Sequence, residues 1–422
     1  MKIFRKLGGR TFASLGRHRN YRLFFSGQVV SVSGTWMQNI AMYWLVLQLT
    51  HSPLALGLLS VARFGPFTLF ALFAGVIVDR LDNRKVVMFT QASQLVLAAA
   101  LTVLALTGLV QTWQVDVIAF LGGTVLVLDA PARQGLTFQM VGRDELPNAI
   151  ALNATLFNLG RVVGPAIAGA MIGVVGIGWC FAVNAASYLA VLVGLLLMRT
   201  SELYPLERHG RPSIIAGTRE GLAFVRRRPR IVAVMTTTVV FASLLFNVNV
   251  LLPILARETL DRGPQVFGVI MAAFGAGALV GALATATVGR ASWRVAAIGA
   301  VAYAFAELAI APLRTVWLVA AVLFIAGICF TVFTANANTT VQLEAPDHLR
   351  GRVLGIYFYA WNGLAPLGAL VVGWLCSVGG TELAFAVLGC IGLAAVALSS
   401  WQLLSSRGIA TRQMLSLPSR AR

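Results

Sequence analysis

Twelve long apolar runs constrain the fold of this chain more than any other feature of its sequence. A helix needs roughly 20 mostly apolar residues to cross about 30 Å of hydrocarbon, and most of the runs reach that length. Only 11% of the 422 residues are charged, and the mean hydropathy of +0.82 is too high for a soluble globule. We therefore expect an all-α integral membrane protein with twelve transmembrane helices. The predicted helices cover residues 23–49, 54–78, 86–109, 113–128, 149–175, 179–198, 231–255, 266–288, 295–311, 316–338, 353–376 and 383–404.

The basic residues are distributed unevenly around these runs. The chain has 33 Lys and Arg against 15 Asp and Glu, a formal net charge of +18. Of the basic residues, 28 fall in the two termini and the even-numbered connections, while Arg257, Arg262 and Arg314 lie on the opposite side. This is the positive-inside distribution, so we expect both termini to be cytoplasmic. The basic segments then lie against anionic lipid head groups, and nucleic-acid binding is not expected.

A polar stretch at residues 200–230 separates six predicted helices from six. The two halves are related in sequence, because four residues of the first half recur 203 positions later: Gln139, Asp144, Leu146 and Gly176 correspond to Gln342, Asp347, Leu349 and Gly379. Repeats of this kind build transporters that handle substrate between their halves near the midplane. We expect two pseudo-symmetric six-helix bundles, at 23–199 and 231–404. The remaining segments are a cytoplasmic basic arm at 1–22, a cytoplasmic linker at 200–230 and a cytoplasmic tail at 405–422.

A charged motif follows the second apolar run. Gly75 lies inside the run, Asp79 and Arg80 stand at its end, and Arg84 follows shortly before the third run. A carboxylate at this position can face the positive end of another helix. The two arginines need acidic partners, and we expect Asp129 to be one. Asp129 should lie near the cytoplasmic end of the fourth helix, where an unpaired carboxylate inside the membrane is costly.

This motif resembles the signature between helices 2 and 3 of the major facilitator superfamily. The superfamily signature has a glycine and an arginine where this chain has Asp82 and Asn83. An aspartate at this position resembles the branch of the superfamily that contains siderophore and macrolide exporters. Residues Gly34–Gln38, Trp44–Thr50, Asp129–Gln134 and Leu349–Val353 also look like the enterobactin-exporter-type branch. The resemblance implies export of a small molecule from the bacterial cytoplasm, across the inner membrane, by proton antiport. It also implies a latch, made of Gly75, Asp79, Arg80, Arg84 and Asp129, that holds the cytoplasmic faces together against a helix beginning near Val353. A charge cluster that only sets the topology is the alternative interpretation.

The fifth predicted helix carries a second motif. It contains Gly160, Arg161, Gly164, Pro165 and Gly169, whose small residues allow a neighbouring helix to approach closely. The pattern resembles the helix 5 motif of antiporters, where it seals the periplasmic side against helix 8, although Ala168 and Ala170 depart from the paired glycines. We expect the complementary surface at Gly277 and Gly281, one turn apart in the eighth run. Ordinary helix packing is the alternative interpretation.

Ionisable and polar groups inside the membrane are candidates for cargo binding or coupling. For Arg161 a structural ion pair and a substrate or coupling role stand as alternatives, and for Arg63 we favour substrate contact. Among the carboxylates, Asp129 acting through the latch is the preferred proton carrier, with Asp116 and Glu307 as alternatives. The further cavity candidates are Asn39, Asn158 and Trp361.

Other function classes lack support in the sequence. There is no Gly-x-x-x-x-Gly-Lys-Ser/Thr loop for a nucleotide-driven pump. The four histidines and four cysteines show no spacing typical of a metal site or an intramembrane enzyme, so no cofactor or metal is expected. The open alternative is a transporter of another cargo or direction, such as lysolipid flipping or solute uptake. We expect a monomer.

Overall fold

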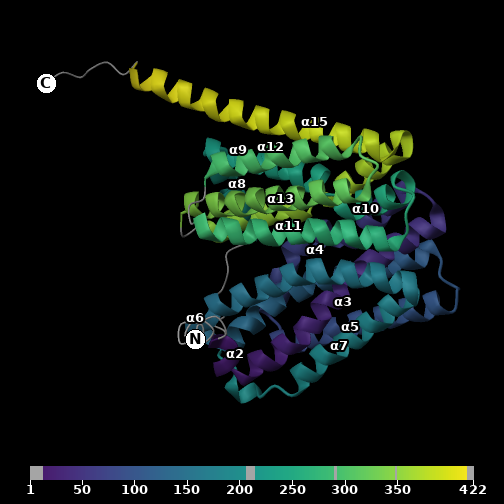
Figure 1. The fold of residues 1–422 in the computed structure, drawn as a ribbon. Coiled ribbons are helices and arrows are strands. Elements are labelled where there is room, and N and C mark those ends of the chain that lie inside the picture. The colour runs from purple at the N-terminus through teal and green to yellow at the C-terminus, as the bar shows by residue number, and fades with distance from the viewer. Residues whose placement is uncertain (1–12, 206–213, 289–291, 347–348, 416–422) are drawn as a thin grey trace, which may run out of the picture.

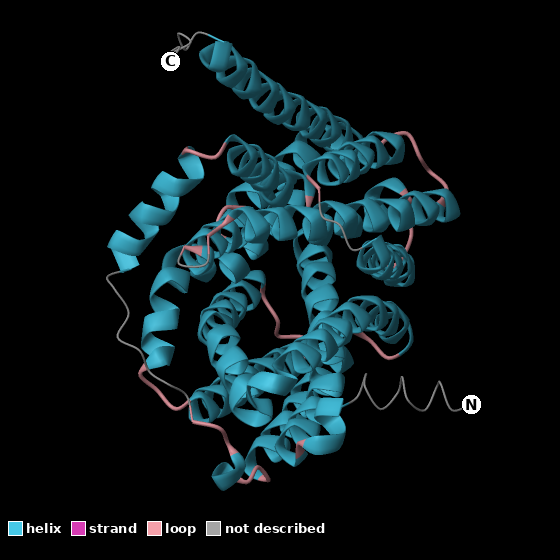
Figure 2. Ribbon diagram, turned by 90° about the vertical axis from the view of Figure 1, so that its left-hand side faces the viewer, coloured by secondary structure: helices cyan, strands magenta, loops and turns pink. Residues whose placement is uncertain are grey.

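The computed structural model describes residues 13–205, 214–288, 292–346 and 349–415. These residues are almost entirely helical and contain no strand (Figures 1 and 2). The all-α prediction is therefore confirmed for the described part of the chain. Residues 1–12 of the predicted basic arm, 206–213 of the linker, 416–422 of the tail and the repeat residue Asp347 lie outside it.

The N-terminal bundle consists of helices packed around α6. Helix α3 packs on α6 and α7, α4 packs on α6, and α5 packs on α6 and α7. A short helix, α2, precedes them and contacts α3 and α6. The bounds are α2 (Ala13–Arg17), α3 (Arg19–Thr50), α4 (Pro53–Asp79), α5 (Asn83–Leu106), α6 (Thr112–Val174) and α7 (Ile177–Leu196).

The C-terminal bundle lies beside the first one (Figure 1). Helix α13 packs on α11 and α12, and α15 packs on α9 and α12. A short turn, η1 (Thr200–Glu202), and a linker helix, α8 (Ile214–Arg226), precede this bundle. The bounds are α9 (Pro229–Val240), η2 (Phe241–Leu245), α10 (Val248–Ile254), η3 (Leu255–Thr259), α11 (Pro264–Val288), α12 (Trp293–Ile310), α13 (Val316–Glu344), α14 (Arg350–Asn362) and α15 (Ala365–Leu415).

Two of the helices are longer than the sequence indicated. Helix α6 joins the fourth and fifth predicted helices, with a break at Gly142 (φ 70°, ψ −176°). Helix α15 contains a similar break at Gly380 (φ 68°, ψ −173°), next to the repeat residue Gly379. A positive φ favours glycine because that residue has no Cβ to clash. Nine segments of the described residues are long and apolar enough to cross a membrane. Helix α6 is one of the nine, although it covers two of the predicted helices. The number of twelve crossings stays a prediction.

The two bundles contact each other mainly at one end of the molecule. We call this the His51 end, because it carries the loop at His51, and we call the opposite end of α4 the Asp79 end. Arg257 of η3 donates to the Leu47 carbonyl oxygen (3.0 Å) and contacts His51. Helices α4 and α15 also approach closely there, since a Cβ added at Gly57 would lie 2.8 Å from the Ala369 carbonyl oxygen. Glycine permits this approach of two backbones.

The Asp79 end is more open. Arg80 and Leu81 are exposed, with Leu81 at 49%. On the other bundle, a Cβ added at Gly351 or Gly355 of α14 would have no other atom within 4 Å. Nearer the middle of α4, Thr68 donates to the Gly363 carbonyl oxygen across the halves (2.7 Å). The bundles are thus packed together at the His51 end and towards the middle, whereas Gly351 and Gly355 of α14 have open space beside them at the Asp79 end.

Candidate functional site

The turn between α4 and α5 holds the charged motif in a defined local geometry. Asp79 is the last residue of α4, and Arg80 caps that helix. Asp82 caps the start of α5 by accepting from the Lys85 backbone N–H (3.2 Å). The aspartate that departs from the superfamily signature therefore stabilises a helix N-terminus, a role that Asp fulfils well. This cap is a feature that the sequence analysis missed, although an Asp followed by a helix start is a readable signal.

Arg84 binds a carbonyl group and not a carboxylate. Its Nε donates to the Leu195 carbonyl oxygen (2.9 Å), in the last turn of α7. A cation is favourable there because the last carbonyl groups of a helix carry partial negative charge. The predicted pairing of Arg84 with Asp129 is therefore wrong.

Asp129 lies in a buried polar cluster within the N-terminal bundle. Its side chain is 5% exposed and forms an ion pair with Arg133, whose Nη2 lies 2.6 Å from Oδ2. On α5, Thr90 Oγ1 (2.6 Å) and Gln91 Nε2 (3.1 Å) donate to its other oxygen. Arg133 also donates to Gln28 of α3. The cluster thus joins α3, α5 and α6 and satisfies both charges.

The partner was missed because the predicted fourth helix ended at Leu128. That boundary placed Arg133 among the loop cations. In the structure α6 continues through this region, so residues 129 and 133 lie one turn apart on the same helix face, which is the spacing that brings opposite charges together. Gly75 lies in α4. Among the described residues, Asp129 forms no hydrogen bond or ion pair with Arg80 or Arg84, so the predicted latch is not joined through Asp129 in this structure.

The helix 5 motif packs on both bundles. A Cβ added at Gly164 would lie 2.9 Å from the Ser33 carbonyl oxygen of α3, and Gly160 contacts Val32 and Trp36. On the other side, a Cβ added at Gly268 of α11 would lie 2.7 Å from the Pro165 carbonyl oxygen. Gly169 meets Gly268 at the same crossing. The small residues therefore permit a close contact between the halves.

The predicted complementary surface on α11 is wrong in its residues, although the helix is the expected one. Gly268 and Gly275 face α6, whereas Gly277 and Gly281 face α13, where a Cβ at Gly281 would lie 2.7 Å from the Ile328 carbonyl oxygen. Successive residues of a helix are rotated by about 100°, so two positions separate nearly opposite faces. Gly275 and Gly277 consequently point to different neighbours.

Arg161 is surrounded by aromatic rings from both bundles. Its guanidinium carbon lies 5.5 Å from the ring centroid of Trp36, 5.6 Å from that of Phe157 and 5.5 Å from that of Phe330. Trp36 belongs to α3, Phe157 to α6 and Phe330 to α13 of the other bundle. Its Nε is buried without a hydrogen-bond partner, and no carboxylate of the described residues pairs with it. The ion-pair alternative for Arg161 is not realised in this structure.

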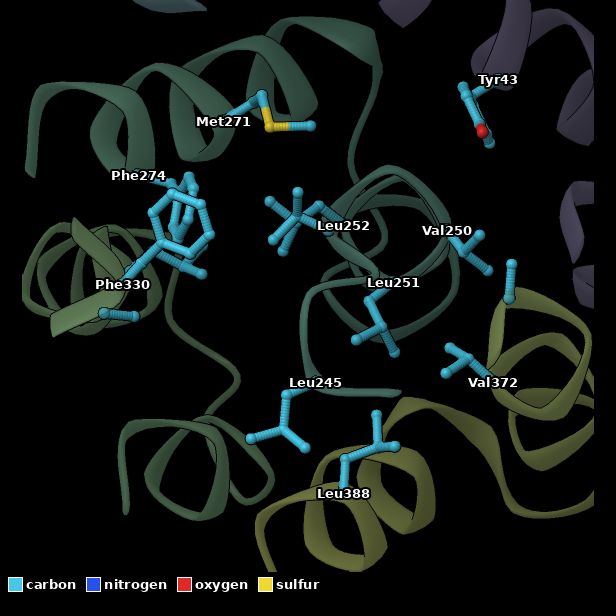
Figure 3. Close-up of a cluster of buried hydrophobic side chains, with 14 of the residues drawn as sticks. Tyr43, Leu245, Val250, Leu251, Leu252, Met271, Phe274, Phe330, Val372 and Leu388 are labelled. Carbon is cyan, nitrogen blue, oxygen red and sulfur yellow. The ribbon is translucent and has the colours of Figure 1, made fainter. Parts of the chain in front are cut away.

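Phe330 is part of a larger aromatic cluster in the C-terminal bundle. Its ring lies 4.3 Å from Phe246 and 5.6 Å from Phe274, and it stacks on Trp361 at 6.1 Å. Figure 3 shows Phe330 of α13 beside Phe274 of α11, with Met271 on the same helix as Phe274 and Leu252 on α10. The predicted cavity residue Trp361 therefore lies behind the ring that covers Arg161.

The other candidate residues are dispersed. Arg63 lies 5.8 Å from the ring of Phe64, and its Nε is buried without a partner. Asn39 donates to Asn249 across the two bundles (3.3 Å), whereas Asn158 donates to a carbonyl oxygen of its own helix. The structure does not bring all of these residues together into one site.

Two carboxylates lack complete hydrogen bonding among the described residues. Glu307 of α12 is 2% exposed, and neither of its carboxylate oxygens has a partner. Asp116, near the start of α6, has one buried oxygen without a partner. Such groups are costly in an apolar interior and are therefore candidates for function. In the described part of the chain no group of His, Cys, Asp and Glu is arranged to hold a metal ion.

Two helical bundles that meet around polar groups near the middle of their helices define a membrane transporter of the major facilitator class. The chain belongs to the transmembrane secretion effector family, whose model matches residues 10–414. The predicted superfamily and fold class are confirmed by this match.

Several characterised proteins are similar to this chain. The multidrug efflux pump Tap of Mycolicibacterium fortuitum is 30% identical over 84% of this chain and 89% of its own length. The staphyloferrin A transporter of Staphylococcus aureus is 25% identical over 87% and 92%, respectively. Macrolide efflux protein A of Streptococcus pyogenes is 23% identical over 63% and 67%.

Solved structures show the same fold at low sequence identity. A POT family transporter in complex with a thioalcohol-conjugated peptide has a TM-score of 0.71 and 14% identity, over 90% of this chain and 95% of that chain. The nucleoside transporter NupG has a TM-score of 0.70 and 13% identity, over 91% and 98%. At these identities the likeness concerns the fold alone.

The polar cluster around Asp129 makes a prediction about stability. Asp129→Asn leaves the partly buried Arg133 without its partner, and removing one member of a fully buried ion pair typically costs about 3–5 kcal/mol, which is the upper limit for this pair. In a thermal-unfolding double-mutant cycle, Asp129→Asn and Arg133→Gln are expected to be strongly non-additive. The control pair, Asp129→Asn with Arg84→Gln, should add to within about 0.5 kcal/mol, because Arg84 binds the Leu195 carbonyl group instead. Coupling of Asp129 to Arg84 and not to Arg133 would contradict the observed pairing.

Proposed function

We propose that this protein is a secondary active efflux transporter, not an enzyme, in the bacterial inner membrane. It exports a small siderophore-like or amphipathic drug-like molecule by alternating access and exchanges it for protons. Its relatives include a multidrug efflux pump, a staphyloferrin A transporter and a macrolide efflux protein, which support export of such cargo. The chain acts as a monomer with both termini in the cytoplasm.

The observation that carries this proposal is the asymmetric contact between the two bundles. At the His51 end they are joined by Arg257 and by the backbone approach of Gly268 to Pro165. At the Asp79 end, Gly351 and Gly355 of α14 face open space. A transporter that alternates must close one end while the other is open. With the basic termini in the cytoplasm, this structure represents the inward-facing state.

The charged turn supplies the latch of the opposite state. When the cytoplasmic end closes, the turn at Asp79 and Arg80 approaches α14, which begins at Arg350. In this inward-facing structure Arg80 remains exposed, as a disengaged latch requires. The Asp129–Arg133 pair stiffens the bundle behind the turn by joining α3, α5 and α6.

A proton carrier must have access to its proton in one state and lose that access in the other. Asp129 is our first choice, because binding of a proton to its carboxylate would weaken the ion pair that joins three helices. Glu307 is the second choice, since among the described residues its buried carboxyl group has no hydrogen-bond partner that must be released. Anionic lipids surround the basic cytoplasmic face and stabilise the orientation.

Orientation can be tested by cysteine labelling in a background without the four native cysteines. Arg262→Cys, in the loop at the His51 end, should react with a membrane-impermeant maleimide added to intact cells. Arg219→Cys on α8 should react only after permeabilisation, because the basic side faces the cytoplasm. Both positions are exposed in the structure, so they form a matched pair. The opposite labelling pattern would reverse the direction of every transport step proposed above.

The latch predicts that Asp79→Asn inserts into the membrane normally but exports cargo at least roughly tenfold more slowly. A shift of 1.4 kcal/mol in a two-state equilibrium is already a factor of ten, and a buried charge contact is typically worth more. The measurement is macrolide and staphyloferrin A transport in vesicles that contain the purified protein. Asp82→Asn is the matched control, because Asn caps a helix as well as Asp does and should leave transport within about twofold. Normal export by Asp79→Asn would reduce the motif to a signal of topology.

If transport is coupled to protons, a transported compound that enters the vesicles should drive protons out of the lumen. A pH-sensitive dye in the lumen detects this loss of protons. Asp129→Asn, Glu307→Gln and Asp116→Asn are compared separately, and at least one should abolish the proton signal. Glu382→Gln is the control, because Glu382 is an exposed carboxylate paired with Arg314 at the His51 end. Wild-type proton flux in all three variants would rule out carboxylate-coupled antiport. If the protein moves the compound only in the direction that corresponds to entry into the cell, it is an importer.

A further inference from the structure

Arg161 combines three properties that the proposed transport cycle does not yet use. It lies inside the membrane-spanning part of α6, its buried Nε has no hydrogen-bond partner among the described residues, and three aromatic rings lie with their centroids 5.5 to 5.6 Å from its guanidinium carbon. Arginine remains protonated in proteins. The aromatic rings therefore stabilise the charge only in part, and no carboxylate of the described residues pairs with the guanidinium group.

The helix face that carries Arg161 changes character at this residue. Towards the Asp79 end, Ala154 and Phe157 are exposed, with Phe157 at 49%, and these side chains lie on the same face as Arg161. Towards the His51 end, Gly164 and Ala168 are buried against the neighbouring helices. Arg161 therefore marks the point on this face where the closed part of the interface begins.

The rings around Arg161 come from both bundles. Trp36 and Phe157 belong to the N-terminal bundle, and Phe330 belongs to the C-terminal bundle, near the middle of α13. The ring of Phe330 stacks on those of Phe246 and Trp361 at interplanar angles of 22°, and the rings of Phe246 and Trp361 also lie 6.1 Å from each other. A ligand held between these rings and the guanidinium group would touch both bundles at once.

The chemistry of these groups defines a ligand class. The planar guanidinium fork matches a carboxylate, which it can bind through two parallel hydrogen bonds. Phenylalanine and tryptophan rings favour an aromatic group through stacking, in addition to apolar contact. A ligand with only one of these features would leave either the N–H edge or the ring surface unused.

We propose that Arg161, together with Trp36, Phe157 and Phe330, binds the carboxylate and adjoining ring of an aromatic organic anion. This inference rests on the proposed function, since it names the chemical class of the exported cargo. The carboxylate replaces the missing hydrogen-bond partner of Arg161, and the ring of the ligand packs against Phe330 and its stacked neighbours. Because Phe330 belongs to the other bundle, the occupied site joins the two halves.

The test is equilibrium binding to the purified full-length protein in lipid nanodiscs. Three probes separate the two features: 2-naphthoate has both, 2-naphthamide has the ring without the charge, and decanoate has the charge without the ring. Wild-type protein should bind 2-naphthoate roughly tenfold or more tightly than either of the others, as a charge-assisted hydrogen bond and an aromatic contact would give. Equal binding of all three probes would overturn the proposal.

Two variants assign the preference to these residues. Arg161→Gln should remove the preference for naphthoate over naphthamide, and Phe330→Leu should reduce the preference for naphthoate over decanoate by about two- to tenfold. The matched controls are Arg314→Gln, an exposed arginine at the His51 end, and Phe305→Leu, 56% exposed on α12. If Arg161→Gln does not fold, Arg161→Lys keeps a charge but loses the planar fork, and it should bind naphthoate at least roughly fivefold more weakly. Unchanged binding by the folded Arg161 variant would overturn the assignment.

The same measurements separate this inference from the proposed function. Binding with the predicted preferences, without proton release in vesicles, would leave the ligand site standing and refute proton-coupled export. Proton-coupled export of a macrolide by a protein that does not prefer the aromatic anion would refute the ligand site and leave the transport function intact.

Discussion

Hydrocarbon cannot hydrogen-bond to a protein, and this constraint governs the whole structure. Each backbone group of a membrane-spanning segment must be satisfied within the chain, which makes the described residues helical almost throughout. The same rule applies to side chains. Asp129 is tolerated inside the N-terminal bundle because Arg133, Thr90 and Gln91 satisfy its carboxylate. A buried polar group without a hydrogen bond raises the free energy of the folded state, so the helices of the bundle pack in a way that satisfies these few polar residues.

The exceptions to this rule are therefore informative. Arg161 has rings but no anion, and Glu307 has no hydrogen-bond partner for either oxygen among the described residues. Both charges of the Asp129–Arg133 pair have partners, whereas Arg161 and Glu307 lack theirs among the described residues. An incomplete polar group inside a membrane protein is expected to meet its partner at another stage of the cycle, as a proton or as cargo. Arg161 lies in the N-terminal bundle and Glu307 in the C-terminal bundle, so the two incomplete groups stand at separate places in the molecule.

Contact between the bundles depends on small residues. Hydrophobic burial does not drive helices together in lipid, so close packing of backbones has to do so. Gly268 against Pro165 and Gly57 against Ala369 are such contacts, and both lie at the His51 end. At the Asp79 end α14 begins without comparable contacts. The backbone contacts between the bundles are therefore local and lie towards the His51 end.

The sequence by itself determined the fold class, because apolar runs of membrane length leave the helix as the main way to satisfy the backbone. It also determined the position of the charged turn, and, through the resemblance of its motifs, the superfamily. Tertiary structure decided the partners. Asp129 pairs with Arg133 because α6 continues past the predicted helix end, and Gly275 faces α6 where Gly277 does not, because a rotation of two residues changes the face of a helix. Phe330 is far from Arg161 in the chain, and its ring lies beside the guanidinium group only because the two bundles pack together. No pattern of residue spacing in the sequence predicts this contact.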